Sequence, residues 1–299
     1  MNKKKLIIMI NILLLLMLTV SVSLHQTFKK AFKRGHLPKR LQQMWYDYSQ
    51  KLYAMGARDF NVTTDDNHVI AGLIIERPLA KRVIVICHGY KRSKEMMANI
   101  AQLFDTDSIV MFDFRAHGKS SGEIISFGLH EVSDIKAIVH FIKLHDSLRL
   151  LPLIGLGFSM GAATLILAQA QEPLFKALIL DSSFATLQQA LERGFILKTK
   201  LPNWCAAMIQ KCAPYVSPID IQIVNPMESI KSIDAPILLI HSCGDALVPL
   251  EHAQLLQNAA KEHKKIWQVN DAIHGAICKM YPEQYKQQID DFLTSIEKK

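Results

Sequence analysis

The chain has 299 residues, of which 49% are hydrophobic and 21% charged, and this composition excludes a disordered protein. Its net charge of +8 comes from the N-terminus, because residues 1–40 hold nine basic residues and no acidic one, whereas the other 259 hold 26 basic and 27 acidic residues. The net positive charge therefore does not indicate a nucleic-acid-binding surface on the folded part of the chain, and we expect no nucleic-acid partner.

An uncharged, mostly apolar run at residues 6–24 predicts a membrane-spanning helix. Its 19 residues would rise roughly 28 Å as a helix, close to the hydrocarbon thickness of a bilayer. We therefore expect residues 1–24 to be an N-terminal anchor of a single-pass membrane protein. A cleaved signal peptide with secretion and a buried core helix are the alternatives. Basic residues flank the run on both sides, so the positive-inside rule does not favour one orientation.

Residues 25–56 are predicted to be a basic juxtamembrane linker followed by a lead-in helix. Six basic residues between positions 29 and 40 favour contact with anionic lipid headgroups, and a solvated linker is the alternative. Apolar positions with helical spacing predict an amphipathic helix at 41–56. Residues 57–299 would then form the folded domain.

The folded domain begins with a predicted hairpin and continues as alternating strands and helices. Two apolar segments at 60–63 and 69–75 are joined by a polar turn. Further strands are expected at 83–87, 108–112, 153–158, 177–181, 237–241 and 266–269, and helices at 93–104, 129–144, 161–171, 250–262 and 283–297. Because the strand runs are apolar without alternation, we predict an α/β fold with a mostly parallel central sheet flanked by helices.

One stretch, at about 184–226, interrupts this alternation and is too long for a simple connection. We predict that it forms a small helical cap insertion over the edge of the sheet. Its apolar residues favour a roof over a pocket for an acyl group, and simple packing of the cap on the sheet is the alternative. These residues are Phe195, Ile196, Leu197, Leu201, Trp204 and Met208.

A serine lies between two glycines at the expected junction of a strand and a helix. Gly157, Ser159 and Gly161 form a G-x-S-x-G string. In this context the string is typical of a nucleophilic serine on a strained turn, where glycines avoid collisions with the neighbouring strand and helix. The helix N-terminus would direct free N–H groups toward developing negative charge. An ordinary helix N-cap is the alternative role for Ser159.

Two polar loops late in the chain carry the partners that a nucleophilic serine needs. Asp245 and His274 each follow a predicted strand. Because the carboxyl ends of parallel strands meet at one edge of a sheet, we expect Ser159, Asp245 and His274 to form a catalytic triad there. Asp181 and Asp113 also follow predicted strands and are the rival carboxylates.

From about residue 57 to 297, the sequence resembles the α/β-hydrolase superfamily, in its serine aminopeptidase-like and monoacylglycerol-lipase-like branch. Beside the serine motif and its partners, the segments that carry the resemblance are 88–90, 113–122, 181–184 and 225–241. The resemblance implies an oxyanion hole formed by the backbone N–H groups of Tyr90 and Met160. Ala116, Ser242 and Ile273 depart from it, since each stands where the branch usually has glycine.

Together these features predict a serine hydrolase that cleaves carboxylic esters through an acyl-enzyme. Its partners would be a small ester or acyl substrate and, through the N-terminal segment, a membrane. Amide and thioester substrates are alternatives, because a fold does not fix a substrate. A catalytically silent scaffold that binds a partner at a membrane is a further alternative, as is lyase or transferase chemistry. No zinc-ligand spacing and no phosphate-binding loop occur in the sequence, so we expect neither a metal nor a cofactor.

Overall fold

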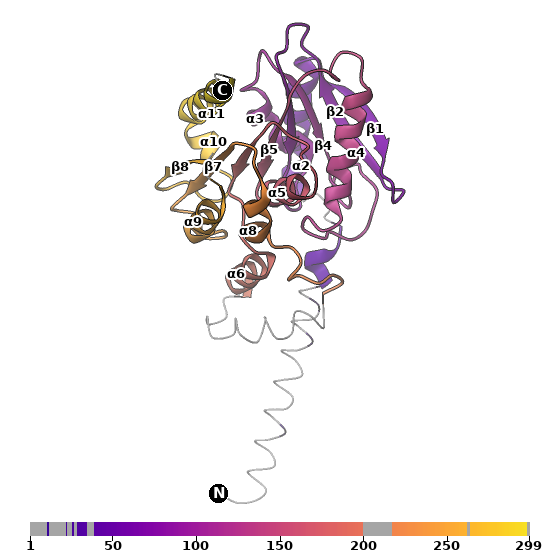
Figure 1. The fold of residues 1–299 in the computed structure, drawn as a ribbon. Helices are drawn as coiled ribbons and strands as arrows, with labels where there is room; N and C mark the ends of the chain where they lie inside the picture. Colours follow the sequence, from indigo (N-terminus) through magenta and orange to yellow (C-terminus); the bar gives the residue numbers. More distant parts are fainter. Residues whose placement is uncertain are drawn as a thin grey trace, which may run out of the picture.

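An eight-stranded sheet forms the centre of the domain, with its strands in the order β1-β2-β4-β3-β5-β6-β7-β8 (Figure 1). The structure is a computed structural model that describes residues 29–34, 39–199, 217–261 and 264–297, with the single positions 11, 22 and 26. β1 is antiparallel to β2, and β2 to β4, whereas the other neighbouring strands are parallel. The strands are β1 (Arg58–Thr63), β2 (Val69–Ile75), β3 (Val83–Cys87), β4 (Ser108–Phe112), β5 (Leu153–Phe158), β6 (Ala177–Asp181), β7 (Ile237–Ser242) and β8 (Lys264–Val269).

The mostly parallel sheet confirms the predicted α/β architecture, and its central strands show why their sequences lack polar positions. In β3, Val83 and Val85 pack into the hydrophobic cluster on one face of the sheet, whereas Ile84 and Ile86 pack into the cluster on the other. Every side chain of this strand is buried. The sequence of a strand that is covered on both faces is apolar at every position, because neither set of alternating side chains is exposed to water.

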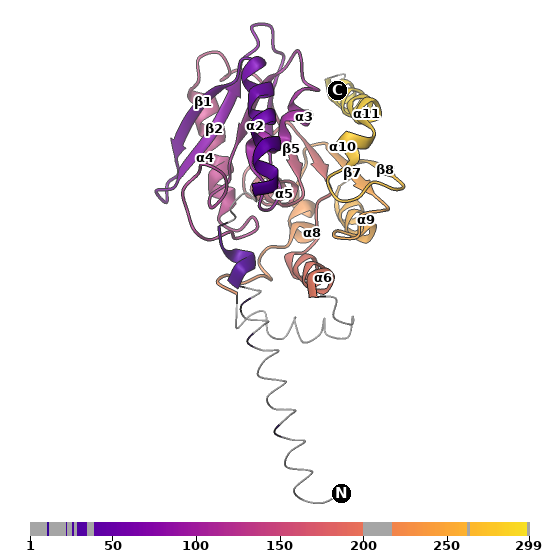
Figure 2. The same cartoon turned by 180° about the vertical axis from the view of Figure 1, so that it is seen from behind.

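Helices cover both faces of the sheet (Figures 1 and 2). One face packs against α2 (Lys39–Ala54), α3 (Ala98–Ala101), α10 (Ile277–Met280) and α11 (Pro282–Glu297). The opposite face packs against α4 (Glu131–Leu144), α5 (Met160–Gln171), α8 (Pro226–Ser229) and α9 (Leu250–Ala259). α6 (Leu187–Thr199) follows β6 and lies within the predicted cap insertion.

Three predicted helices differ from the observed elements, and one of them, expected at 250–262, ends at Ala259. The helix expected at 93–104 is a 3₁₀ turn (Lys94–Met97) followed by the single α-helical turn α3. The helix expected at 41–56 ends at Ala54, because Gly56 has a φ of 89° and the N–H of Ala57 returns to the carbonyl of Leu52. Glycine takes this left-handed conformation at little cost and commonly ends a helix.

Residues 29–34, which fall in the predicted linker, pack against the folded domain. Phe32 is 2% exposed, and its ring meets that of Phe127 edge to face, with 5.4 Å between the centroids. The guanidinium of Arg34 donates hydrogen bonds of 2.8–3.1 Å to three backbone carbonyls, those of Gly118, Ser120 and Gly122. The segment is therefore held against the loop that follows β4.

Arg34→Ala should destabilise the domain by about 1–2 kcal/mol, because it removes a charged donor from three backbone carbonyls. A thermal denaturation curve of the full chain would show this as a lowered midpoint. Lys33→Ala is the matched control, since Lys33 is exposed and joins the domain through its backbone, by a bridge to Ile124. Equal midpoints for the two variants would contradict a docking role for Arg34.

Two predictions concern residues outside those that the structure describes. The predicted membrane anchor at residues 1–24 is one, apart from positions 11 and 22. Residues 200–216 of the predicted cap insertion are the other, and they include Leu201, Trp204 and Met208. Among the described helices, none is both long enough and apolar enough to cross a bilayer.

Candidate active site

Ser159 lies on a tight turn between β5 and α5. Its backbone has φ 53° and ψ −115°, outside the conformations that residues with a side chain prefer. The N–H of Ser159 donates to the carbonyl of Asp181 on β6 at 2.8 Å, and its own carbonyl accepts from the N–H of Ala163 in α5. The neighbouring strand and the helix thus hold the turn from both sides.

Gly157 and Gly161 leave the space that this turn requires. A Cβ atom at Gly157 would lie 2.5 Å from Cα of Ala162, and one at Gly161 would collide with the carbonyl oxygen of Cys87 on β3. Both obstacles are backbone atoms, which cannot move without shifting α5 or the sheet. The physical reason for the two glycines of the motif is therefore steric.

The structure brings Ser159, His274 and Asp245 together in one chain of hydrogen bonds. Nε2 of His274 lies 3.0 Å from Oγ of Ser159, and its Nδ1 lies 2.6 Å from Oδ2 of Asp245. The other carboxylate oxygen of Asp245 accepts from the N–H groups of Leu247 and Val248 at 3.0 and 2.8 Å. These hydrogen bonds fix the orientation of the buried Asp245 carboxylate, with its other oxygen toward the imidazole.

The rival carboxylates are engaged elsewhere. Asp181 accepts hydrogen bonds from the hydroxyl of Ser182 at 2.8 Å and from that of Tyr285 at 3.0 Å. Burial raises the pKa of Asp181 to about 6. Asp113 forms a buried ion pair with Nζ of Lys94 at 2.7 Å. Neither has a hydrogen bond to His274 among the described residues, which leaves Asp245 as the carboxylate on the imidazole.

The loop after β3 carries Tyr90, whose N–H is predicted to help form the oxyanion hole. Nε2 of the buried His88 accepts from the N–H of Phe114 at 3.0 Å, and Nε2 of His117 accepts from the N–H of Lys91 at 3.1 Å. Burial lowers the pKa of both histidines to about 4. They stay neutral at neutral pH, because a protonated Nε2 could not accept these bonds, and so they position the loop rather than titrate.

Met160, the other predicted oxyanion residue, is the first residue of α5. The N–H groups in the first turn of an α-helix have no partner within the helix, and the helix dipole adds partial positive charge there. Met160 and Tyr90 both line the cavity that contains Ser159. Their backbone donors thus belong to the same edge of the sheet as the serine hydroxyl.

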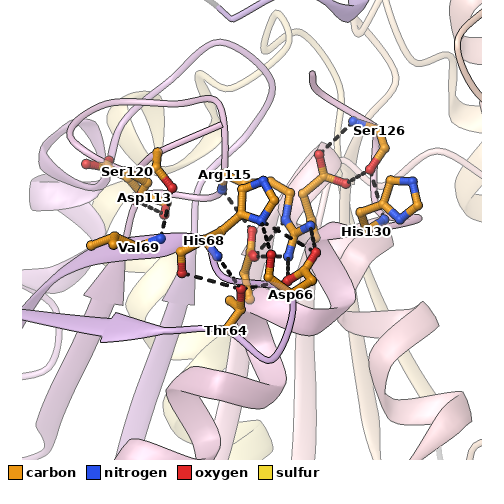
Figure 3. Close-up of polar contacts among 12 residues, drawn as sticks. Thr64, Asp66, His68, Val69, Asp113, Arg115, Ser120, Ser126 and His130 are labelled. Atoms are coloured by element: carbon orange, nitrogen blue, oxygen red, sulfur yellow. Dashed lines mark hydrogen bonds and ion pairs between the residues drawn. The ribbon is translucent and has the colours of Figure 1, made fainter. Parts of the chain in front are cut away.

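Ion pairs of Arg115, one with the buried Asp134 and one with the exposed Asp66, fix the loop after β4, which supplies His117. Arg115 donates to Asp134 on α4 at 2.8 Å and to both carboxylate oxygens of Asp66 at 2.6 and 3.0 Å, as Figure 3 shows for Asp66. The hydrogen-bonded guanidinium holds the pKa of Asp66 well below its usual range. Ala116, next along the loop, has a φ of 58°, a left-handed conformation that glycine adopts at less cost than alanine.

A cavity of about 370 Å³ opens at Ser159. Its walls are mostly apolar, and α6 from the predicted cap insertion supplies one of them through Leu187, Leu191 and Phe195. Residues 30–31 contribute to another wall. They are held there by a hydrogen bond of 2.8 Å from the hydroxyl of Tyr90 to the carbonyl of Ala31. Of the other predicted roof residues, Ile196 is half-buried and Leu197 exposed.

The sequence did not reveal the contribution of residues 30–31 to the cavity. Ala31 and Tyr90 lie 59 positions apart in the chain. Their contact leaves no periodic pattern, because it joins an irregular loop to a short docked segment. The buried histidines, by contrast, follow predicted strands, so their place near the edge of the sheet could be anticipated.

Comparisons with known proteins agree with this geometry. Residues 78–226 match the family described as serine aminopeptidase, S33. The chain is 25% identical to the uncharacterized protein YqkD of Bacillus subtilis over 267 residues, 86% of each chain, and 24% identical to human monoglyceride lipase over 247 residues, 68% of this chain and 78% of the lipase. The crystal structure of the esterase Pf2001 of Pyrococcus furiosus is 26% identical, with a TM-score of 0.69 over 82% of this chain and 95% of the esterase.

The matched segment runs from just before β3 to the first residue of α8 and contains Ser159, Tyr90 and Met160. The sheet order, the flanking helices and the strand-turn-helix position of the serine agree with that match. The chain belongs to the α/β-hydrolase superfamily, in the branch of the serine aminopeptidases of family S33.

Proposed function

We propose that the protein is a serine hydrolase that cleaves carboxylic esters, with Ser159, His274 and Asp245 as its catalytic triad. The observation that carries this proposal is the continuous chain of hydrogen bonds from Oγ of Ser159 through the imidazole to the carboxylate. A serine hydroxyl is a weak nucleophile unless a base within hydrogen-bond distance takes its proton. The 3.0 Å contact with Nε2 supplies that base.

In the first half of the proposed reaction, Oγ of Ser159 attacks the ester carbonyl while Nε2 of His274 accepts the hydroxyl proton. Asp245 holds Nδ1 protonated and stabilises the imidazolium that forms. The N–H groups of Tyr90 and Met160 bind the oxyanion of the tetrahedral intermediate. The carbon–oxygen bond to the alcohol then breaks, the imidazolium gives its proton to the leaving alkoxide, and an acyl-enzyme remains.

In the second half, a water molecule attacks the acyl-enzyme and His274 accepts its proton. The new tetrahedral oxyanion occupies the same two N–H groups. Its collapse breaks the bond to Oγ of Ser159, which regains a proton from the imidazolium. The products are the carboxylic acid, the alcohol and the free enzyme.

The cavity supports an acyl substrate. Phe127, Phe184 and Leu191 give it apolar walls that would remove an acyl chain from water, worth about 0.8 kcal/mol for each buried CH₂ group. The similarity to a protein named an esterase and to one named a monoglyceride lipase points in the same direction. Cleavage of amide and thioester bonds would use the same groups, because a fold does not fix a substrate.

The test is a series of p-nitrophenyl esters from acetate through butyrate and octanoate to palmitate, assayed beside aminoacyl p-nitroanilides and acyl-coenzyme A thioesters. We expect kcat/KM for the esters to rise with chain length until the cavity is full, and to exceed that for the anilides. Preferential hydrolysis of the anilides or of the thioesters would replace the ester assignment. Turnover of none of them would contradict the proposal.

We also infer that residues 6–24 anchor the protein in a membrane, on the strength of their uncharged apolar sequence. The full chain should stay in the membrane fraction after extraction with alkaline carbonate. Replacing Leu14 and Leu16 by arginine should release it, since each charge in the middle of the bilayer costs about 3 kcal/mol. A wild-type chain found in the supernatant, or one whose intact mass lacks the first residues, would contradict an uncleaved anchor.

A further inference from the structure

Three lysines line the cavity at Ser159, and they come from three distant parts of the chain. Lys30 belongs to the docked N-terminal segment, Lys91 to the loop after β3, and Lys198 to the last turn of α6. All three are exposed. Among the described residues that line the cavity, none is an aspartate or a glutamate. The opening of an otherwise apolar cavity thus carries a concentration of positive charge.

Contacts with the protein hold the side chain of Lys91, and one of them joins it to the segment that carries Lys30. Nζ of Lys91 donates to the carbonyl of Lys30 at 2.8 Å and lies 5.1 Å from the centroid of the Tyr90 ring. Partial burial of its ammonium group lowers the pKa of Lys91, and the charge of Lys198 lowers it further, as expected for two ammonium groups that face the same space. Placing like charges together costs free energy unless an anion lies between them.

The sequence around these lysines offers no carboxylate to neutralise them. Residues 1–46, 88–94 and 193–219 contain no acidic residue. The glutamate that follows the second of these segments, Glu95, lies 3.2 Å from Nζ of the buried Lys94. Among the described residues, none of the three lysines forms an ion pair with a carboxylate, so their positive charge is available to a bound ligand.

The position of the charge indicates where the anion of that ligand lies. Lys91 directly follows Tyr90, the residue proposed to bind the oxyanion, and lines the same cavity as Ser159. The apolar walls, with Phe127 and Leu191, extend from the same place. A matching ligand has an apolar chain on one side of its ester and an anionic group a few atoms away on the other.

We propose that the cavity takes anionic amphiphiles, namely acyl esters whose alcohol part carries a phosphate or a carboxylate that Lys30, Lys91 and Lys198 bind. This inference rests on the proposed function and names its substrate class. Lysine ammonium groups bind phosphate as point charges and tolerate different geometries, which suits three flexible side chains around one opening. The lysines would then select the substrate, whereas the triad would cleave it.

The test compares two substrates that differ by one phosphate, octanoylglycerol and octanoylglycerol phosphate, both below their micellar concentrations. The wild-type full chain should prefer the phosphate by about tenfold or more in kcat/KM. Lys30→Gln and Lys198→Gln should each lower this preference severalfold, and the double variant should bring it near one. Lys143→Gln, in the last turn of α4, is the matched control, because Lys143 is also exposed and should leave the preference unchanged.

A binding measurement tests recognition of the anionic group independently of ester hydrolysis. Calorimetry with Ser159→Ala should show octyl phosphate binding more tightly than octanol, and Lys198→Gln in that background should reduce the difference severalfold. Inorganic phosphate alone should not bind at the same concentration, since it lacks the apolar chain. A wild-type chain that hydrolyses none of the esters but still binds octyl phosphate more tightly than octanol would refute the proposed function and support this inference.

Two results would overturn the inference. One is equal kcat/KM for the neutral and phosphorylated substrates, or equal binding of octanol and octyl phosphate. The other is an unchanged preference in the lysine variants combined with weaker binding to vesicles of anionic lipid, which would assign the lysines to the membrane surface instead of the substrate.

Discussion

Ser159→Ala should lower ester hydrolysis by at least about 10⁴-fold while leaving the fold intact. The substitution removes the nucleophile, but it keeps a Cβ atom on the strained turn, where Ser159 has a φ of 53°. The N–H groups of Tyr90 and Met160 would remain, so binding of substrate should persist. Initial rates with p-nitrophenyl octanoate, together with a thermal denaturation midpoint, measure both expectations.

Ser182→Ala is the matched control for this variant. Ser182 follows β6 as Ser159 follows β5, has a φ of 55°, and is also buried, but its hydroxyl donates to Asp181 instead of meeting an imidazole. Its activity should stay within a few fold of the wild type. Comparable losses in the two variants would mean that disturbance of this edge of the sheet, and not loss of a nucleophile, explains the effect.

Asp245→Asn should lower kcat by about 10⁴-fold, even though the two side chains have the same shape. In the wild type one carboxylate oxygen accepts from the N–H groups of Leu247 and Val248. The amide oxygen of asparagine would keep those bonds, which turns its NH₂ group toward Nδ1 of His274. The imidazole would then carry its proton on Nε2 and could no longer accept the proton of Ser159.

Asp181→Asn should change kcat by less than about threefold, because this carboxylate contacts Ser182 and Tyr285 and has no hydrogen bond to the imidazole among the described residues. Steady-state kinetics of the two asparagine variants under identical conditions compare them directly. A large loss for Asp181→Asn with little loss for Asp245→Asn would move the acid of the triad to residue 181.

The central sheet could be predicted because each of its strands and flanking helices leaves a pattern of apolar residues within a short segment of the sequence. Strands such as β3 and β7 are short apolar runs, and helices such as α4 and α11 have apolar positions with helical spacing. Alternation of the two kinds of segment then fixes a mostly parallel sheet, which places residues after different strands at the same edge. The proximity of Ser159, Asp245 and His274 follows from that rule.

Contacts between irregular segments could not be predicted in the same way. Arg34 bonds to carbonyls more than eighty positions away, and the sequence gives no sign that Lys91 and Lys198 share one cavity. The short turn α3 was expected as part of a longer helix, since apolar spacing does not show where hydrogen bonds change from a 3₁₀ to an α-helical pattern. Such features depend on tertiary packing, which leaves no periodic pattern of apolar residues in the sequence.

The central claim is that Ser159 is an activated nucleophile, and labelling with a fluorophosphonate tests it most directly. The hydroxyl would displace fluoride from phosphorus and form a stable adduct, a reaction that requires the imidazole of His274 as base. We expect mass spectrometry of the digested full chain to place the adduct on Ser159, and His274→Ala to slow its formation strongly. An unlabelled protein, or an adduct on another serine, would contradict the account and favour a scaffold without catalytic activity.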